Sequence, residues 1–253
     1  MNIMSDLADA KVFRICAAAA ILTGCGGLQA QNGLQAQNGL QVQSSALTPV
    51  RANPAEWGHN HHRSWMSPKA KSEDLLYVSN LGNSTVSVYS LSQRKLVGML
   101  TGLGDPYGLC SDTQGNVWIV LWGPSKVVEF AHGGTQILKR LDDPKGNPYD
   151  CSVDPTTGNL AVTNWNFGGY WLQGNVAVYA HASGTPHLYN GQWFWYFYGV
   201  AYDDRGNLYA DGLSSYFNGL FCVGILRKGG ASFKKVDDAL DAPYGLTVSL
   251  AKN

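Results

Sequence analysis

The chain has 253 residues, and its 18 Lys and Arg balance its 18 Asp and Glu, so its formal net charge is zero. A neutral chain offers no basic surface to phosphates, so we expect no nucleic-acid partner. Charged residues make up only 14%, against about a quarter in typical soluble domains. Glycine is abundant, with 30 residues, and aromatic residues reach 11%. This balance disfavours disorder and predicts turn-rich β structure rather than long amphipathic helices.

The N-terminus has the pattern of an export signal. Lys11 and Arg14 precede an apolar stretch over residues 15–22 that ends in Leu22-Thr23-Gly24-Cys25. This segment resembles the signal peptide of bacterial lipoproteins, in which the cysteine after the cleavage site receives a diacylglycerol. The resemblance implies that residues 1–24 form a signal helix that is removed, and that Cys25 is the lipidation site. A plain secretory signal or an Ala-rich helix is the alternative.

Residues 25–72 are predicted to form a low-complexity tether and a flexible linker. Between residues 27 and 43 the chain repeats the uncharged hexapeptide Gly-Leu-Gln-Ala-Gln-Asn, which has neither a helix period nor a strand period. Residues 44–72 contain three prolines among residues of mixed polarity. Several acyl chains would anchor such a tether stably. We therefore expect an exported protein, anchored to the membrane in the periplasm or on the outer surface of a bacterial cell envelope.

An internal repeat occupies the remainder of the chain, residues 73–253. Each copy begins near a tyrosine, followed by an Asp and a Gly-Asn pair and then by an apolar run, and the tyrosines are 42, 49 and 46 residues apart. Periods in this range are typical of propeller blades with four short strands each. The repeat tyrosines are Tyr107, Tyr149, Tyr198 and Tyr244.

Each copy can be divided into four strands. The first follows the tyrosine, and the Asp and Gly-Asn form a hairpin turn because Asp caps it and Gly and Asn tolerate positive φ. A second and a third apolar strand follow, and then an outer strand. Lys139 and Arg140 in one copy, and Lys234 and Lys235 in another, protect the outer edge from pairing with other chains. The predicted fold class is all-β, a β-propeller of about four four-stranded blades.

The repeat pattern also resembles a known group of propellers. The strand endings Val78-Ser79-Asn80 and Val162-Thr163-Asn164, together with the turn and a Val-x-Val-Tyr strand, are similar to those of NHL-repeat and SMP-30-like (gluconolactonase-like) propellers of secreted bacterial proteins. The likeness covers residues 75–250. Those propellers commonly have six blades, so this chain resembles a C-terminally shortened member.

The two ends of the repeat region are complementary. The first unit offers only its second, third and fourth strands, at residues 75–80, 85–89 and 95–100, and the last offers a lone first strand at residues 244–250. Pairing of the two would close a ring of four blades. Because the wedge angle of the resembled propellers suits about six units, we expect an open arc or an incompletely closed ring.

The same resemblance implies a central divalent metal held by scattered carboxylate and Asn side chains in the hydrolases of the group. The candidates here are Asn80, Asn164 and Asp211, but Asp211 falls one position early and Leu121 stands at the equivalent place in the second copy. A hard cation requires several oxygen ligands. The residues therefore predict no cofactor, and Ca²⁺ is the metal to consider if the protein is such a hydrolase.

A run of six aromatic residues, 193–198, is the most unusual local feature. Aromatic side chains bring a large contact area at small entropic cost, so Trp193 and Trp195 are candidate ligand-binding residues. Tyr170 and Trp171, in a preceding loop, are expected to add a second wall. The alternative is core filling between blades, since consecutive strand residues point to both faces.

Three cysteines remain after removal of the signal and acylation of Cys25, namely Cys110, Cys151 and Cys222. An odd number leaves at least one unpaired in an exported protein. Cys110 and Cys151 follow their tyrosines by three and two residues, so on regular neighbouring strands they would face different directions. We therefore predict buried thiols rather than a disulfide.

These observations favour a non-enzymatic binding module. Its expected partners are the membrane, through the lipid anchor, and an unknown small-molecule or protein ligand. The alternative is a metal-dependent lactonase-like hydrolase, which rests on the resemblance alone and lacks an evident set of metal ligands.

Overall fold

The computed structural model describes residues 63–143, 146–165, 173–214 and 220–249. The chain divides into two units, residues 1–51 and 52–253, and all of the described residues belong to the second. The predicted signal peptide, Cys25 and the hexapeptide repeats lie outside these ranges. No helix within them is long and apolar enough to cross a membrane.

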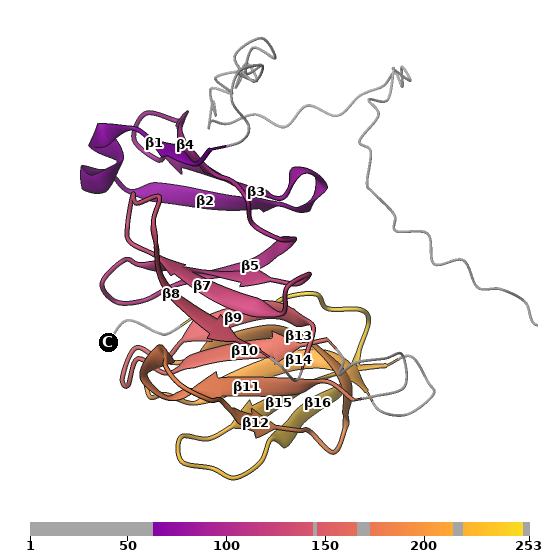
Figure 1. Cartoon of the computed structure of the whole chain (residues 1–253). Coiled ribbons are helices and arrows are strands. Elements are labelled where there is room, and N and C mark those ends of the chain that lie inside the picture. The colour runs from indigo at the N-terminus through magenta and orange to yellow at the C-terminus, as the bar shows by residue number, and fades with distance from the viewer. Residues whose placement is uncertain (1–62, 144–145, 166–172, 215–219, 250–253) are drawn as a thin grey trace, which may run out of the picture. The chain divides into compact units, whose positions relative to one another are not determined.

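Strands in the described ranges form four antiparallel sheets of four strands each (Figure 1). Sheet 1 has the order β1 (Trp65–Met66), β4 (Lys95–Leu100), β3 (Thr85–Ser90) and β2 (Leu75–Asn80). Sheet 2 comprises β5 (Pro106–Ser111), β6 (Val117–Leu121), β7 (Lys126–Phe130) and β8 (Ile137–Asp142). Sheet 3 comprises β9 (Pro148–Val153), β10 (Leu160–Asn164), β11 (Asn175–Tyr179) and β12 (His187–Tyr189). Sheet 4 comprises β13 (Phe194–Tyr202), β14 (Leu208–Ser214), β15 (Phe221–Leu226) and β16 (Lys234–Leu240). The predicted all-β architecture of four-stranded blades is confirmed.

The hydrophobic core lies between successive sheets. Trp118 and Tyr179 fill the space between sheets 2 and 3. Phe194 and Phe197 pack between sheets 3 and 4, with their ring centroids 4.3 Å apart. The pairing of β13 with β14 is irregular just after Phe194 and again just after Phe197. Because such an irregularity changes the direction of the side chains, these two aromatic residues, three apart in sequence, face the same core. Part of the predicted aromatic run therefore serves as core.

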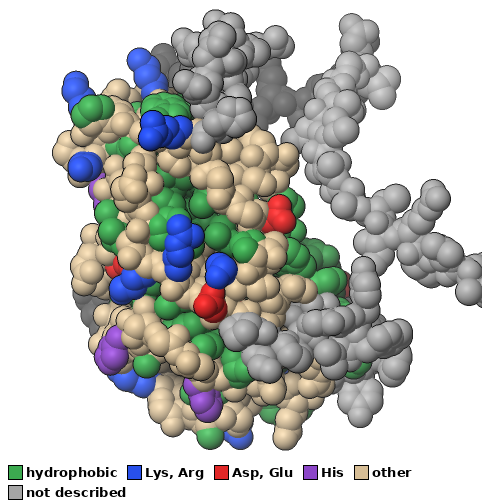
Figure 2. Space-filling view, in the orientation of Figure 1, with side chains coloured by type: hydrophobic (Ala, Val, Ile, Leu, Met, Phe, Trp, Pro, Cys, Tyr) green, Lys and Arg blue, Asp and Glu red, His purple; other side chains and the backbone are tan. Residues whose placement is uncertain are grey.

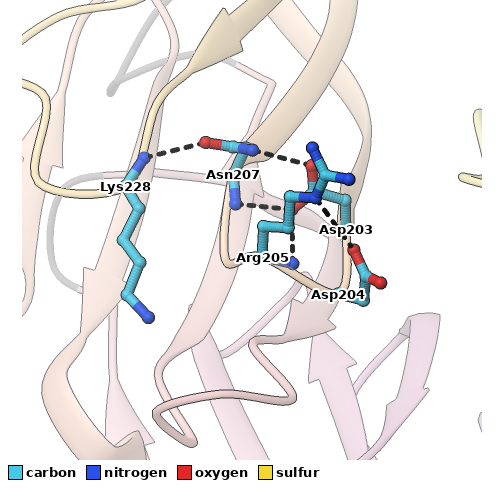
Figure 3. Close-up of polar contacts among 5 residues, drawn as sticks. All are labelled: Asp203, Asp204, Arg205, Asn207 and Lys228. Carbon is cyan, nitrogen blue, oxygen red and sulfur yellow. Dashed lines mark hydrogen bonds and ion pairs between the residues drawn. The ribbon is translucent and has the colours of Figure 1, made fainter.

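The hairpin turn between the first and second strand of a blade is built as predicted. Asp203 Oδ1 accepts hydrogen bonds from the backbone N–H groups of Arg205 and Asn207, at 3.0 and 2.7 Å, and Asn207 Nδ2 donates to Asp203 Oδ2 at 2.8 Å (Figure 3). Gly206 supplies the positive φ of 79°. Asn207 Oδ1 also accepts from the backbone N–H of Lys228 at 3.1 Å, so the turn is tied to the next hairpin of the same sheet.

The outer strands carry charge, also as predicted. Lys139 and Arg140 on β8, and Lys234 and Lys235 on β16, are exposed. On the face shown in Figure 2, Lys and Arg side chains are scattered rather than gathered into one patch. Charged side chains on an outer edge discourage pairing with strands of other chains.

The arc of sheets is open at its first blade. Sheet 1 has a fourth strand, but it is the short β1 at the outer edge next to β4, formed within the range predicted as linker. The edge of β2 is left without an inner partner among the described strands, because residues 243–249 form no strand. The predicted lone strand at residues 244–250 is thus not formed over residues 244–249. The open arrangement agrees with the expected fold class.

One prediction about the cysteines is wrong. Cys110 on β5 and Cys151 on β9 form a disulfide, with Cα atoms 5.6 Å apart. The spacing argument assumed regular strands, but the pairing of β5 with β6 is irregular between Pro106 and Leu109. Such an irregularity changes the direction of the side chains that follow it, so the two cysteines meet between adjacent inner strands. Cys222 is buried outside this disulfide, and its Sγ lies 3.9 Å from the Trp193 carbonyl oxygen.

Candidate functional site

The repeat tyrosines form a row across the inner strands. The ring centroids of Tyr107 and Tyr149 are 5.2 Å apart, those of Tyr149 and Tyr198 are 5.6 Å apart, and those of Tyr198 and Tyr244 are 5.2 Å apart. The first three lie on β5, β9 and β13, the inner strands of successive sheets (Figure 1). Equivalent positions of the repeat lie side by side on neighbouring inner strands, so residues that recur along the sequence form a row in space.

A second set of aromatic rings extends this row. Trp122 follows β6 and stacks on Tyr107 at 5.1 Å, and Trp165 follows β10 and lies 5.6 Å from Trp122. Tyr196 lies 4.8 Å from Trp165. We call the continuous set the aromatic surface; it consists of Tyr107, Trp122, Tyr149, Trp165, Tyr196, Tyr198 and Tyr244. Its rings are half-buried, apart from Tyr244, which is 64% exposed.

A pocket of about 320 Å³ opens beside this surface. Tyr107, Tyr149 and Tyr244 line it, together with Asp150, Ser79 near the end of β2, and Leu81 just after that strand. The pocket therefore joins three inner segments of the repeat to the open edge of sheet 1. Its volume is at the lower end of the roughly 300–1,000 Å³ of small-molecule sites.

Asp150 is a departure from the repeat. The residue after the tyrosine is Gly108, Gly199 and Gly245 in the other copies. A Cβ on Gly108 would lie 2.6 Å from Asp150 Oδ1, so the missing side chain of the neighbouring inner strand makes room for the carboxylate. Oδ2 accepts a hydrogen bond from the backbone N–H of Val200 at 3.2 Å. The carboxylate is thus held between β5 and β13 at the pocket.

Burial raises the pKa of Asp150 to about 6, hydrogen bonds from the backbone N–H groups of Cys151 and Val200 oppose the rise, and the nearby charge of Asp211 adds to it. Burial also raises the pKa of Asp211, whose Oδ1 accepts from the Gly199 backbone N–H at 2.6 Å. No ion pair found among the described residues includes either carboxylate. The two acids give this part of the molecule a negative character, and no basic residue in the described ranges forms an ion pair with either of them.

The residues considered as metal ligands have separate hydrogen-bond partners. Asn80 is exposed and accepts a hydrogen bond from the Gly82 backbone N–H at 3.1 Å. Asn164 is buried and donates to Asp143 Oδ2 and Asn175 Oδ1, at 3.1 and 3.0 Å. Across the described part of the chain, no three His, Cys, Asp or Glu side chains come together in a geometry that could hold a metal ion.

The predicted ligand-binding tryptophans lie at or beyond the margin of the aromatic surface. Trp195 contacts Tyr196 with centroids 6.2 Å apart. Trp193 lies in the turn before β13, and Lys235 Nζ lies 5.7 Å from its ring centroid. Tyr170 and Trp171 are outside the described residues. The sequence prediction did not include the aromatic surface. Its signal in the sequence is the recurrence of the repeat tyrosines next to Gly or Asp.

A scan against protein-family models finds no match for the chain, and neither does a search of curated protein sequences. Solved structures do resemble it. A chain of a nidogen/laminin complex has a TM-score of 0.54 and 16% identity, covering 69% of this chain and 65% of that one. Hydrazine synthase of Kuenenia stuttgartiensis has a TM-score of 0.53 and 15% identity, covering 69% and 53%.

Virginiamycin B lyase from Staphylococcus aureus has a TM-score of 0.52 and 11% identity, covering 69% of this chain and 55% of the lyase. The chain therefore spans between about half and two thirds of the length of these neighbours. The likeness to propeller structures supports a β-propeller fold for the four sheets. At this level of identity it shows the fold alone.

Proposed function

We propose that the protein is a lipid-anchored, extracytoplasmic β-propeller that binds a small organic ligand at the aromatic surface. The observation that carries this proposal is the continuity of half-buried rings, from Trp122 through Tyr149 to Tyr198, beside a pocket of about 320 Å³. Partly exposed aromatic rings offer a large, rigid and amphipathic contact area. Such rings at the rim of a concave site are the usual lining of ligand pockets.

The disulfide between Cys110 and Cys151 supports the proposed compartment. Disulfides form and persist in oxidising environments such as the bacterial periplasm and the cell surface, and are rare in the cytosol. This agrees with the export signal and with lipidation at Cys25. The lactonase-like alternative is not favoured, because the Asp and Asn candidates that the structure describes each have separate hydrogen-bond partners.

Membrane anchoring is tested with Cys25→Ala in the full-length protein. The variant should appear in the soluble extracytoplasmic fraction, whereas the wild type stays with the membranes, because the acyl chains supply the anchor. Cys222→Ala serves as the control, since that cysteine is buried in sheet 4, and it should fractionate like the wild type. Membrane association of Cys25→Ala would contradict the anchor.

Ligand binding is tested by screening small organic compounds against the full-length protein in a non-ionic detergent, with tryptophan fluorescence as the readout. Trp122→Ala removes a ring of the aromatic surface, and Trp193→Ala removes a ring outside it. Ligands of the proposed site should lose at least about tenfold in affinity with the first variant, in keeping with the large share of binding energy carried by aromatic anchors. They should be little affected by the second. Binding that depends on Trp193 instead would contradict the proposal.

A further inference from the structure

The pocket beside the aromatic surface combines two features that attract positive charge. Tyr107, Tyr149 and Tyr244 line it, and Asp150 lies among them. The faces of aromatic rings carry a partial negative charge that binds cations, and a carboxylate supplies a full one. We propose that this pocket binds an organic cation, with a substituted ammonium group placed against the tyrosine rings and the Asp150 carboxylate. This inference rests on the proposed binding function and specifies the ligand class.

The backbone of the two neighbouring inner strands holds the Asp150 carboxylate in place at the pocket. Asp150 Oδ2 is held by the Val200 N–H on β13, whereas Oδ1 lies on the side of Gly108, where an added Cβ would approach it to 2.6 Å. Gly108 itself lines the pocket. One oxygen is therefore fixed by the neighbouring inner strand, and the other lies against Gly108, a residue that lines the same pocket. A Gly at position 150, as in the other copies, would leave the pocket without this charge.

The charge balance around the pocket favours a cationic ligand over a neutral one. Asp150 is desolvated by burial, and Asp211 on β14 adds a second negative group. No Lys, Arg or His forms an ion pair with either residue within the part of the chain that the structure describes. A neutral ligand would desolvate Asp150 further without compensation, whereas an ammonium group would supply the missing opposite charge.

The lining favours an organic cation over a bare metal ion. Ca²⁺ takes about six to eight oxygen ligands at short distance. A pocket lined by three tyrosine rings and a single carboxylate offers far fewer. Alkylammonium groups are weakly hydrated at their carbon atoms and are well suited to aromatic walls. The pocket volume of about 320 Å³ is also that of a small-molecule site.

The test compares choline with its neutral isostere 3,3-dimethylbutan-1-ol, using the full-length protein in a non-ionic detergent and tyrosine ring resonances as the readout. We expect choline to bind at least about tenfold more tightly than the isostere, because only choline gains the cation–π and carboxylate contacts. Asp150→Asn should remove most of this preference and leave the affinity for the isostere within about twofold, because the amide oxygen still accepts from Val200. Tyr244→Ala should weaken both probes, since that ring is a wall of the pocket.

The pH dependence provides a second readout. Choline affinity should fall about tenfold between about pH 7.5 and pH 5, because Asp150 has a pKa of about 6 and gains a proton over this range. Burial also raises the pKa of Asp211. Tyr149 and Tyr198 stay neutral, because burial raises their pKa values. Among the described residues, Tyr107 and Tyr244 are the other titratable groups that line the pocket with Asp150. In Asp150→Asn the decrease should be largely absent.

Equal affinity for the two probes, or choline binding that is unchanged in Asp150→Asn, would overturn the inference. Binding of the isostere alone would do the same and would leave the proposed binding function intact. If neither probe shifts the pocket tyrosines, the cation inference fails, and the fluorescence screen with Trp122→Ala then decides the proposed function independently.

Discussion

The carboxylate of Asp150 on β9 accepts a hydrogen bond from the backbone N–H of Val200 on β13, with Oδ2 and N 3.2 Å apart. Two residues further along both strands, Ser152 Oγ accepts from the Tyr202 N–H at 3.0 Å. The inner strands of sheets 3 and 4 do not form a ladder with each other. Side chains of β9 therefore satisfy donors on the inner edge of β13, and this fixes the position of the pocket carboxylate.

Stability should increase as the pH falls from about 7 to 5. The pKa of Asp150 is raised to about 6 in the folded protein from its ordinary value of 3.8. The folded state therefore binds this proton more tightly than the unfolded state does, and the stability that the bound proton provides is lost as the pH rises through about 6. The gain should be about 1 kcal/mol over this range. Denaturant unfolding at several pH values measures it, and Asp150→Asn should show a smaller change. An identical pH response in the variant would contradict the raised pKa.

Removal of the disulfide should destabilise the arc strongly. Cys110 and Cys151 close a loop with a sequence separation of 41 residues, for which loop-closure entropy corresponds to about 4 kcal/mol. Cys110→Ser should lower the free energy of unfolding by roughly this amount, as measured in urea. Reduction of the wild type should have a similar effect and should leave Cys110→Ser almost unchanged. If the oxidised and the reduced wild type unfolded at the same urea concentration, the disulfide would contribute little to stability.

Deletion of residues 243–253 should leave the fold intact. Residues 243–249 form no strand and add no ladder hydrogen bonds to β2, so the expected loss is the packing of Tyr244 on Tyr198 and Phe221, about 1–2 kcal/mol. Thermal unfolding followed by circular dichroism measures the change. Global unfolding of the truncated protein would show that the C-terminal segment closes the ring, contrary to the open arc. Choline binding should weaken even though the fold persists, because a wall of the pocket is lost.

Adjacent aspartates in the turn between β13 and β14 should differ sharply. Asp203 is buried and holds three hydrogen bonds with Arg205 and Asn207, whereas Asp204 makes only a long surface contact of 3.9 Å with Arg205 Nε (Figure 3). Asp203→Ala should therefore cost about 1–3 kcal/mol in unfolding free energy. Asp204→Ala should cost less than about 0.5 kcal/mol. Comparable losses in the two variants would contradict this assignment of the cap.

The sequence was sufficient to predict the strands and turns of the repeat because their causes are local. The apolar run after each turn predicted a strand, as in β6 and β10. Asp followed by Gly-Asn predicted turns that satisfy their own backbone groups. The charges on the outer strands follow from the same short-range signals, whereas the fold class follows from the spacing of 42 to 49 residues between the repeat tyrosines. The prediction of a C-terminal strand was wrong for residues 244–249. This segment does not pair with β2; instead, the Tyr244 ring packs on Tyr198 and Phe221 of sheet 4.

Only the tertiary structure determined which distant residues meet. The disulfide depends on an irregularity in β5 that rotates Cys110 toward Cys151, and strand periodicity alone does not encode such an irregularity. The pocket likewise arises because inner strands 40 to 50 residues apart lie side by side, so that Gly108 makes room for Asp150 and the rings of the repeat tyrosines contact one another. A period along the chain identifies equivalent positions. Their distances, burial and shared electrostatic environment are set by the packing of one blade against the next.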